Sequence, residues 1–224
     1  MKIDILTIFP EMFPEVLNSS IIGRAQKKGL VKIKVHNLRD WTKDKHKTVD
    51  DKPFGGGAGM VMKVDIIDRA LQSFKSGHKV LLTPQGKTFK QKTAAALSRK
   101  KHLILICGHY EGFDERIRSL VDEEISIGDY VLTGGEIPAM AVVDAVTRLI
   151  PGVIEAKSLK EESFNKNLLE CPQYTRPEEY KKMKVPAVLL SGNHALIKQW
   201  REQEAWKRTK QRRADLLKQV RLHQ

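Results

Sequence analysis

The 224-residue sequence has only two cysteines, Cys107 and Cys171, and they lie far apart. Two isolated cysteines form neither a disulfide framework nor the paired spacing of a zinc site. No stretch approaches the roughly 18 consecutive apolar residues that a membrane-spanning helix needs, and residues 1–5 lack the pattern of a secretory signal peptide. We therefore expect a cytoplasmic protein without a membrane span, in which Cys107 is a buried thiol at the end of an apolar run.

The chain is neither strongly apolar nor evenly charged. Hydrophobic residues make up 41%, which is ordinary for a globular protein, and the length suits one large domain or two small ones. The formal charge is +13, and residues 157–224 hold 16 Lys and Arg against 8 Asp and Glu. A basic face of this kind attracts polyanions. It favours a nucleic-acid partner over an ordinary solvated helix surface.

Short apolar runs alternate with helical segments over the first two thirds of the chain. This alternation is typical of an α/β fold with a parallel sheet. The run 31–37 alternates apolar and polar residues, which indicates a half-buried strand near an edge. The expected strands are 2–9, 31–37, 79–83, 102–107 and 122–126, and the expected helices are 11–28, 64–74, 88–97, 113–121 and 137–146.

Three of the expected strands end in turns of small residues, at 83–86, 108–112 and 126–135. The carboxyl ends of neighbouring parallel strands meet at one edge of a sheet, where such folds bind small molecules. The turn 126–135 mixes apolar and polar residues, which suits a ligand with a flat ring and hydrogen-bonding groups. The three turns therefore predict one shared pocket, although ordinary strand-to-helix connections would give the same spacing.

The segment 38–63 is long and polar, and it contains a glycine-rich stretch at 53–60. That stretch has neither the spacing of the phosphate-cradling loop nor that of the dinucleotide turn. A structureless segment of this length is usually functional or disordered. Two interpretations stay open, a mobile loop that covers a ligand and a plain linker.

The character of the chain changes after Pro151-Gly152. Residues 157–168 are polar and are expected to form a flexible linker between an α/β domain at 1–156 and a basic domain at 169–224. The last part is expected to be all-helical, broken at three prolines, with a final helix that starts near Gly192-Asn193-His194.

Six motifs together resemble one family, from Met1 to about Leu217. They are Ile8-Phe9-Pro10-Glu11-Met12-Phe13, Pro53-Phe54-Gly55-Gly56-Gly57-Ala58-Gly59-Met60, Thr83-Pro84-Gln85-Gly86, Cys107-Gly108-His109-Tyr110-Glu111-Gly112, the stretch from Ser126 to Glu136, and Cys171-Pro172-Gln173-Tyr174-Thr175-Arg176-Pro177. The chain resembles the bacterial tRNA (guanine-37-N1)-methyltransferases of the SPOUT superfamily. The resemblance implies S-adenosylmethionine as methyl donor, guanosine 37 of tRNA as acceptor, a homodimer and a trefoil knot in the α/β domain.

The resemblance also implies which residues bind the donor. The backbone of the third turn would read the edge of adenine, while the apolar side chains of Leu82 and Leu132 would cover its faces. The positions that match the donor-binding residues of the family are Pro84, Gly108, Ile127, Gly128, Asp129, Tyr130, Val131, Leu132 and Gly135.

Methyl transfer to guanine nitrogen-1 requires that its proton leave, and a positioned carboxylate can take that proton. The negative charge that moves to the guanine oxygen is stabilised by an arginine. By resemblance these roles match Glu162 and Arg148. Glu162 stands where the family has aspartate, and its neighbour Glu161 stays an alternative.

Three other residues receive expected roles from the resemblance. Glu111 is expected to orient the substrate or a magnesium ion, and Asp114 to cap a helix and to contact the tRNA. His109 replaces an arginine that the family often has, so a basic contact there would depend on pH.

Two other functions compete with this one. A SPOUT methyltransferase acting on a ribose hydroxyl or on ribosomal RNA would share the donor turns but not the linker carboxylate. A non-catalytic RNA-binding protein would use only the basic tail and would not bind the donor.

Overall fold

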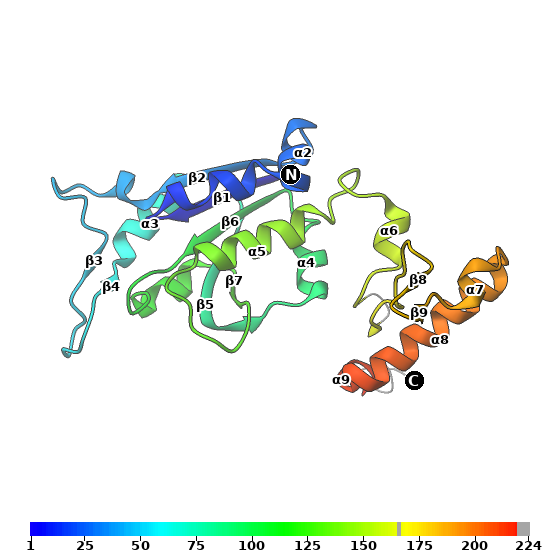
Figure 1. The fold of residues 1–224 in the computed structure, drawn as a ribbon. Helices are drawn as coiled ribbons and strands as arrows, with labels where there is room; N and C mark the ends of the chain where they lie inside the picture. The colour runs from blue at the N-terminus through cyan, green and yellow to red at the C-terminus, as the bar shows by residue number, and fades with distance from the viewer. Residues whose placement is uncertain (165–166, 219–224) are drawn as a thin grey trace. The chain divides into compact units, whose positions relative to one another are not determined.

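The computed structural model of the protein describes residues 1–164 and 167–218. The chain forms two compact units, Met1–Ile154 and Glu155–Gln224. Figure 1 shows the elements of each unit along the chain. Residues 165–166 of the expected linker and 219–224 of the expected basic domain lie outside the described residues.

The first unit is built on a five-stranded sheet whose paired strands are all parallel. Its strand order is β2-β1-β6-β5-β7, which confirms the predicted parallel α/β architecture and the edge position of the strand at 31–37. The strands are β1 Lys2–Thr7, β2 Lys32–Asn37, β5 His78–Thr88, β6 His102–Cys107 and β7 Glu123–Ser126.

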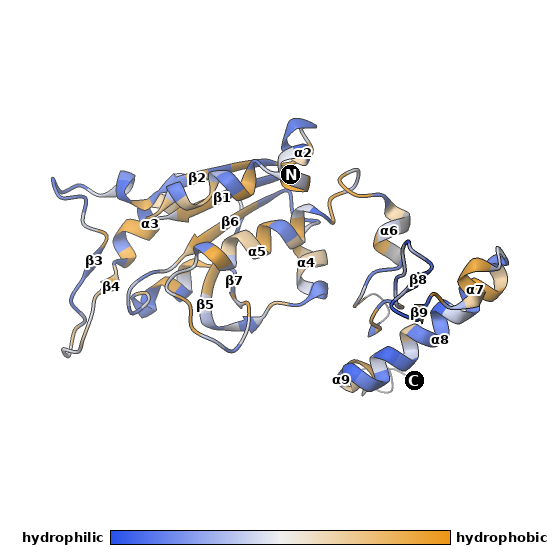
Figure 2. Ribbon diagram, in the orientation of Figure 1, coloured by the Kyte–Doolittle hydropathy of each residue, from blue (hydrophilic) through white to orange (hydrophobic). Residues whose placement is uncertain are grey.

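Both faces of the sheet are covered, because successive side chains of a strand point to opposite faces. On β6, Leu103, Leu105 and Cys107 belong to one buried cluster, while Ile104 and Ile106 belong to the other. Figure 2 shows the matching hydrophobic colour on the central strands. The helices of the first cluster are α1 Pro14–Leu17, α2 Ser20–Lys27, α4 Gln91–Leu97 and α5 Glu136–Thr147; those of the second are η2 Leu38–Trp41, α3 Val64–Gln72 and η3 Glu115–Leu120.

Two segments before α3 differ from expectation. The helical segment expected at 11–28 is confirmed but divided: η1 Pro10–Met12, α1 and α2 follow one another. Ser19, one of the two expected caps, is the N-cap residue of α2, and the next residue, Ser20, has a φ of 48°. The segment 38–63 is not structureless. It holds η2 and the antiparallel pair β3 Asp50–Asp51 and β4 Val61–Met62.

Two further predictions were wrong in the middle of the chain. Residues 84–86 do not end a strand, because β5 runs through them with a register shift between Leu82 and Lys87. The helix expected at 113–121 is the shorter 3-10 helix η3. In both places the local composition is compatible with a turn, and pairing with distant elements decides the outcome.

The second unit contains the helices α6 Ala156–Lys160, α7 Ala187–Leu190, α8 His194–Arg212 and α9 Ala214–Lys218. The all-helical prediction was wrong, because β8 Glu179–Tyr180 and β9 Met183–Lys184 form an antiparallel pair. The predicted start of the long helix is confirmed: the side chain of Asn193 accepts hydrogen bonds from the N–H groups of Ala195 and Leu196. No helix in the described part of the chain is long and apolar enough to cross a membrane.

Candidate functional site

A cavity of about 230 Å³ lies where three segments of the first unit meet, the second half of β5 and the loops that follow β6 and β7, called the second and third loops. These segments belong to the carboxyl-terminal halves or ends of β5, β6 and β7, as the parallel order of these strands predicts. Its lining combines the residues of all three segments: Leu82, Thr83, Pro84, Gly108, His109, Tyr110, Glu111, Gly112, Phe113, Ile125, Ser126, Ile127, Gly128, Tyr130, Val131, Leu132, Thr133, Gly134, Gly135 and Pro138.

The second and third loops are in direct backbone contact. The N–H of Gly135 donates a 2.8 Å hydrogen bond to the carbonyl of Gly108. A Cβ atom on Gly135 would lie 2.7 Å from both the Cα of Cys107 and the nitrogen of Gly108. Since these are backbone atoms, only glycine allows the two loops to approach this closely.

The β5 segment is held against its neighbours by the register shift and by one arginine. A Cβ atom on Gly86 would lie 2.4 Å from the nitrogen of Ile125 on β7. Arg118 on η3 donates hydrogen bonds to Gln85 and to Glu124. This arginine therefore fixes the strand segment that carries Pro84 to the strand that leads into the third loop.

Most residues expected to bind the donor line the cavity together. Those that do are Pro84, Gly108, Ile127, Gly128, Tyr130, Val131, Leu132 and Gly135. Asp129 is exposed and is not among the lining residues. Ser126 adds a contact that the sequence did not single out: its Oγ donates to the carbonyl of Gly128 and accepts from the Gly128 N–H. The short spacing between a serine and a following glycine is the only signal that could have indicated it.

Glu111 lines the cavity next to the β3–β4 hairpin. Its N–H donates a 3.0 Å hydrogen bond to the carbonyl of Met60. A Cβ atom on Gly59 would lie 2.4 Å from the Oε1 atom of Glu111. The hairpin that follows residues 38–49 is thereby fixed to the second loop through its β4 arm.

A buried polar pair lies beside these loops. The hydroxyl of Thr7 donates a 2.7 Å hydrogen bond to Oε1 of Glu136, and the two side chains are 0% and 2% exposed. Burial, together with the nearby charge of Glu136, raises the pKa of the Cys107 thiol well above its usual value. Cys107 is therefore an inert buried thiol, as the sequence predicted. Thr7 and Glu136 had no local signal, because their pairing joins residues 129 positions apart.

The imidazole of His109 lies in the cavity wall between two aromatic rings. Its centroid is 4.8 Å from that of Phe9 and 5.1 Å from that of Tyr110. Its Nδ1 is buried without a hydrogen-bond partner among the described residues, and a Cβ atom on Gly134 would lie 2.8 Å from it. Packing against both loops fixes the ring in place.

Asp114 is placed differently from the donor-binding set. Its side chain accepts a hydrogen bond from the N–H of Arg116 at the start of η3, as a helix cap does, and it forms an ion pair with the Arg116 guanidinium. The hydrogen bonds from Arg116 lower the pKa of Asp114 to about 2. Asp114 is not among the residues that line the cavity.

The two residues expected to act on the guanine are also outside this cavity. Arg148 caps the carboxyl end of α5, and its N–H donates to the carbonyl of Asp144. At 1.5 Å per residue, Arg148 lies roughly 20 Å along the helix from Gly135. Glu162 belongs to the second unit, where it is half-buried. Its neighbour Glu161 lies 4.0 Å from the guanidinium of Arg201.

Nothing in the described residues supports a magnesium site. Within residues 1–164 and 167–218, no group of three or more His, Cys, Asp or Glu side chains is placed to bind a metal ion. The described residues therefore give no support to the expectation that Glu111 orients a magnesium ion.

Comparison with known proteins gives a consistent result over the whole chain. Residues 1–219 match the family described as tRNA (Guanine-1)-methyltransferase TrmD. A protein of Dictyoglomus turgidum is 59% identical and covers 100% of this chain and 93% of its own length. One of Carboxydothermus hydrogenoformans is 58% identical over 97% of this chain and 88% of its own length. Both relatives are named tRNA (guanine-N(1)-)-methyltransferase.

Proposed function

The chain belongs to the tRNA (guanine-1)-methyltransferase family, and we propose that it transfers a methyl group from S-adenosylmethionine to nitrogen-1 of guanosine 37 in tRNA. The observation that carries this proposal is the meeting of the second half of β5 and the loops after β6 and β7 around one cavity at the carboxyl edge of the parallel sheet. The tRNA acceptor agrees with the names of the relatives and with the excess of cations in the second unit.

The cavity has the properties that a bound nucleoside needs. It joins apolar side chains such as Leu82 and Leu132 to the backbone of residues 127–128 and 130–132, which can pair with the polar edge of adenine. The absence of side chains at Gly108 and Gly135 lets the Phe113 ring and the backbone of Cys107 pack directly against the two loops that line the cavity. When bound, S-adenosylmethionine supplies an electrophilic methyl group.

The acceptor needs a base because nitrogen-1 of guanine carries a proton at neutral pH. We assign the base to Glu162, whose carboxylate takes that proton. Arg148 donates hydrogen bonds to the guanine oxygen as negative charge moves onto it, and so stabilises the transition state more than the ground state. Glutamate reaches one methylene further than the aspartate of the family, and the segment that follows α6 accommodates the difference.

The site is assigned to two copies of the chain. Arg148 lies roughly 20 Å along α5 from the glycine that lines the cavity of the same chain. An active site that combines the cavity with Arg148 and Glu162 is therefore completed by a second copy, in a homodimer. A site shared between two copies also explains why the donor-binding and acceptor-binding residues are far apart in sequence.

The finer features of the fold are part of the same proposal. The tight contacts of the second and third loops suit the trefoil knot of the SPOUT superfamily. The basic part of the second unit, from residue 169, is assigned to tRNA binding, and the chain between it and the first unit includes α6. We also propose a cytoplasmic enzyme, in agreement with a tRNA substrate.

Methylation of tRNA transcripts tests the proposal. With tritiated S-adenosylmethionine, a transcript that carries guanosine at position 37 is expected to accept one methyl group, and the matched adenosine-37 transcript none. Equal labelling of both transcripts would indicate a different RNA site. Calorimetric titration with S-adenosylmethionine supplies the second readout, because a protein that only binds RNA would give no heat of donor binding.

A further inference from the structure

The turn between β8 and β9 consists of two lysines in an uncommon backbone conformation. Glu179 pairs with Lys184 and Tyr180 with Met183, so Lys181 and Lys182 are the two turn residues. Their φ angles are 49° and 65°. A two-residue hairpin turn of this kind needs positive φ at both positions, which is why Asn-Gly and Gly-Gly are its usual sequences.

Lysine makes the turn less stable than glycine would at these positions. A side chain with a Cβ atom destabilises the left-handed conformation, whereas glycine adopts it without penalty. Backbone conformations of this kind persist where the surrounding structure enforces them, and they gather at functional sites. The turn therefore carries two cations where stability alone would favour glycine or asparagine.

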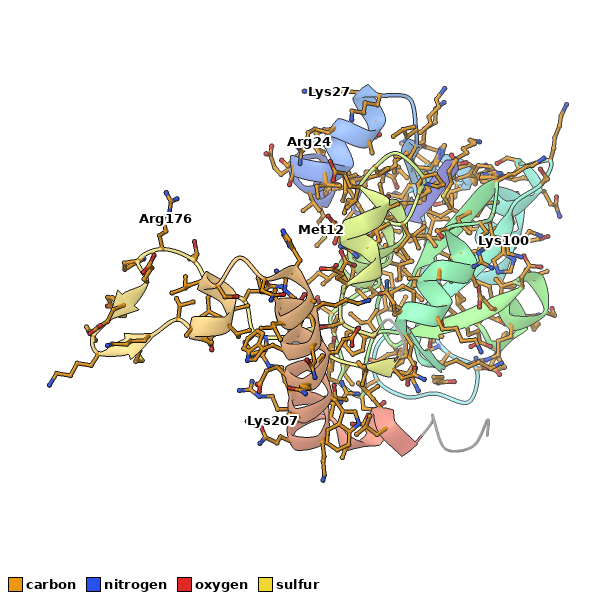
Figure 3. The ribbon with its side chains drawn as sticks, turned by 90° about the vertical axis from the view of Figure 1, so that its right-hand side faces the viewer. Met12, Arg24, Lys27, Lys100, Arg176 and Lys207 are labelled. Carbon is orange, nitrogen blue, oxygen red and sulfur yellow. The ribbon has the colours of Figure 1, made fainter. Side chains whose placement is uncertain are left out.

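The surroundings of the turn are exposed and rich in cations. Every residue from 173 to 184 is exposed, including the ring of Tyr180 at 57%. Figure 3 shows Arg176, in the segment before β8, pointing away from the ribbon. The Nζ of Lys184 lies 3.6 Å from Glu179, and that of Lys181 lies 5.3 Å from the centroid of the Tyr180 ring. In the described part of the chain, Lys182 makes no ion pair.

We propose that the β8–β9 turn is a phosphate-binding contact for the tRNA, with Lys182 on the phosphate and Lys181 beside it. This inference rests on the proposed function, from which it takes the identity of the polyanion. A lysine ammonium binds phosphate as a point charge and is most available when it has no carboxylate partner. The local charge favours a polyanion, because residues 173–184 hold four Lys and Arg against two Glu.

Three substitutions of Lys182 distinguish the effect of its charge from the effect of its strained backbone. Lys182→Gly removes both the charge and the strain, Lys182→Asn removes the charge with a residue that tolerates positive φ, and Lys182→Arg keeps the charge. Lys47→Gly is the matched control, because Lys47 is also exposed and has a φ of 53° in the other unit. The measurements are tRNA affinity by fluorescence anisotropy without methyl donor, the KM for tRNA, and the Tm.

The loss of one phosphate contact has a defined size. Counterion release predicts that log affinity falls with log salt at a slope of about −0.7 for each phosphate contacted on unpaired RNA. One such contact therefore raises the tRNA affinity roughly threefold at 200 mM salt and roughly eightfold at 50 mM salt. We expect these losses in Lys182→Gly and Lys182→Asn, with an unchanged kcat. We also expect the Tm of Lys182→Gly to rise by about 2–4 °C, while Lys182→Arg binds as the wild type does.

Three results would overturn the inference. They are wild-type affinity of Lys182→Gly at both salt concentrations, an equal loss of affinity in Lys47→Gly, and a change in oligomeric state of Lys182→Gly by light scattering. The last would identify the turn as a contact between protein copies. Failure of the proposed function is distinguishable, because it is seen as lack of guanosine-37 methylation by the wild type, whereas the binding assay contains no donor.

Discussion

The hydroxyl of Thr7 donates a 2.7 Å hydrogen bond to Oε1 of Glu136, and this contact joins the end of β1 to the first residue of α5. Thr7 also accepts a hydrogen bond from the N–H of Phe9. The other oxygen of Glu136 lies 2.3 Å from where a Cβ atom of Gly134 would be. A buried carboxylate at the start of a helix is favoured by the helix dipole, and here it also supports the third loop of the cavity.

Replacement of Thr7 by valine tests this support. The substitution keeps the shape of the side chain but leaves a buried carboxylate and the Phe9 N–H without their partner. A lost hydrogen bond to a charged group costs about 1.5–3 kcal/mol. We expect urea unfolding to show a loss of that size, with weaker donor binding by calorimetry. Unfolding unchanged within about 0.5 kcal/mol would contradict the role assigned to the pair.

Thr147 lies at the other end of α5, and replacing it with valine should have the opposite effect on stability to the Thr7 replacement. Its hydroxyl is buried, and it has no hydrogen-bond partner in the described part of the chain. Thr147→Val removes an unsatisfied polar atom without a change of shape, so we expect the free energy of unfolding to rise by about 1 kcal/mol. Destabilisation by this variant would show that the hydroxyl is bonded in solution.

Asp4 predicts how stability depends on pH. Its buried carboxylate accepts hydrogen bonds from His36 at 2.7 Å and from His102 at 2.6 Å, and forms an ion pair with Lys2. Burial alone would raise the pKa of Asp4, but these partners outweigh burial and hold it well below its usual value. A lowered pKa contributes stability that is fully present above about pH 4 and is lost as the pH falls further.

Asp4→Asn should therefore lower the free energy of unfolding at pH 7 by at least about 2 kcal/mol. The difference from the wild type should shrink as the pH falls below about 4, because the Asp4 carboxylate of the unfolded wild-type chain takes up a proton there while that of the folded protein stays ionised. Urea unfolding across this range measures it, with the exposed Asp51→Asn as the control. A difference that stays constant with pH would mean that Asp4 contributes by shape and not by charge.

Gly135→Ala tests the close contact of the second and third loops. The added methyl group would lie 2.7 Å from backbone atoms of Cys107 and Gly108, which cannot move aside as a flexible side chain does. We expect the loops to separate and the donor affinity to fall at least tenfold in calorimetry. Gly29→Ala is the control, since nothing lies within 4 Å of its added methyl group although its φ is 71°. It should lose about 1 kcal/mol of stability and keep donor affinity.

The positive charge of the second unit predicts how the affinity for tRNA depends on salt concentration. If about six phosphates are neutralised, log affinity should fall with log salt at a slope of about −4. Anisotropy with an unmodified tRNA transcript between 50 and 300 mM salt measures the slope. An affinity that does not change over this range would exclude an electrostatic role for the basic unit.

The parallel sheet and the meeting of the three predicted segments at one pocket could be predicted from the sequence because both follow from local patterns. Buried strands such as β6 appear as uninterrupted apolar runs. The parallel order then places the loops at one edge, whatever the details of the helices. The pocket could be predicted because small residues follow the expected strands in the sequence, and this needed no knowledge of the helices.

Features set by distant contacts could not be predicted in this way. Residues 84–86 have the composition of a turn, yet pairing with β7 keeps them in β5. The turn between β8 and β9 is Lys181-Lys182 and not the glycine- or asparagine-containing pair that usually indicates a tight hairpin, so the sequence did not predict these two strands. The same reason hides the buried Thr7–Glu136 pair, which no local periodicity indicates.

Glu162→Gln tests the assignment of the general base. The amide cannot accept a proton from guanine nitrogen-1, so we expect kcat to fall by a factor of 10²–10⁴, with donor affinity within twofold of the wild type. Glu162→Asp restores the aspartate of the family and should keep most of the activity. Glu161→Gln is the neighbouring control, and its carboxylate already lies 4.0 Å from Arg201. Full turnover in Glu162→Gln, with loss in Glu161→Gln, would move the base to Glu161, because only the carboxylate that takes the proton is indispensable to the chemical step.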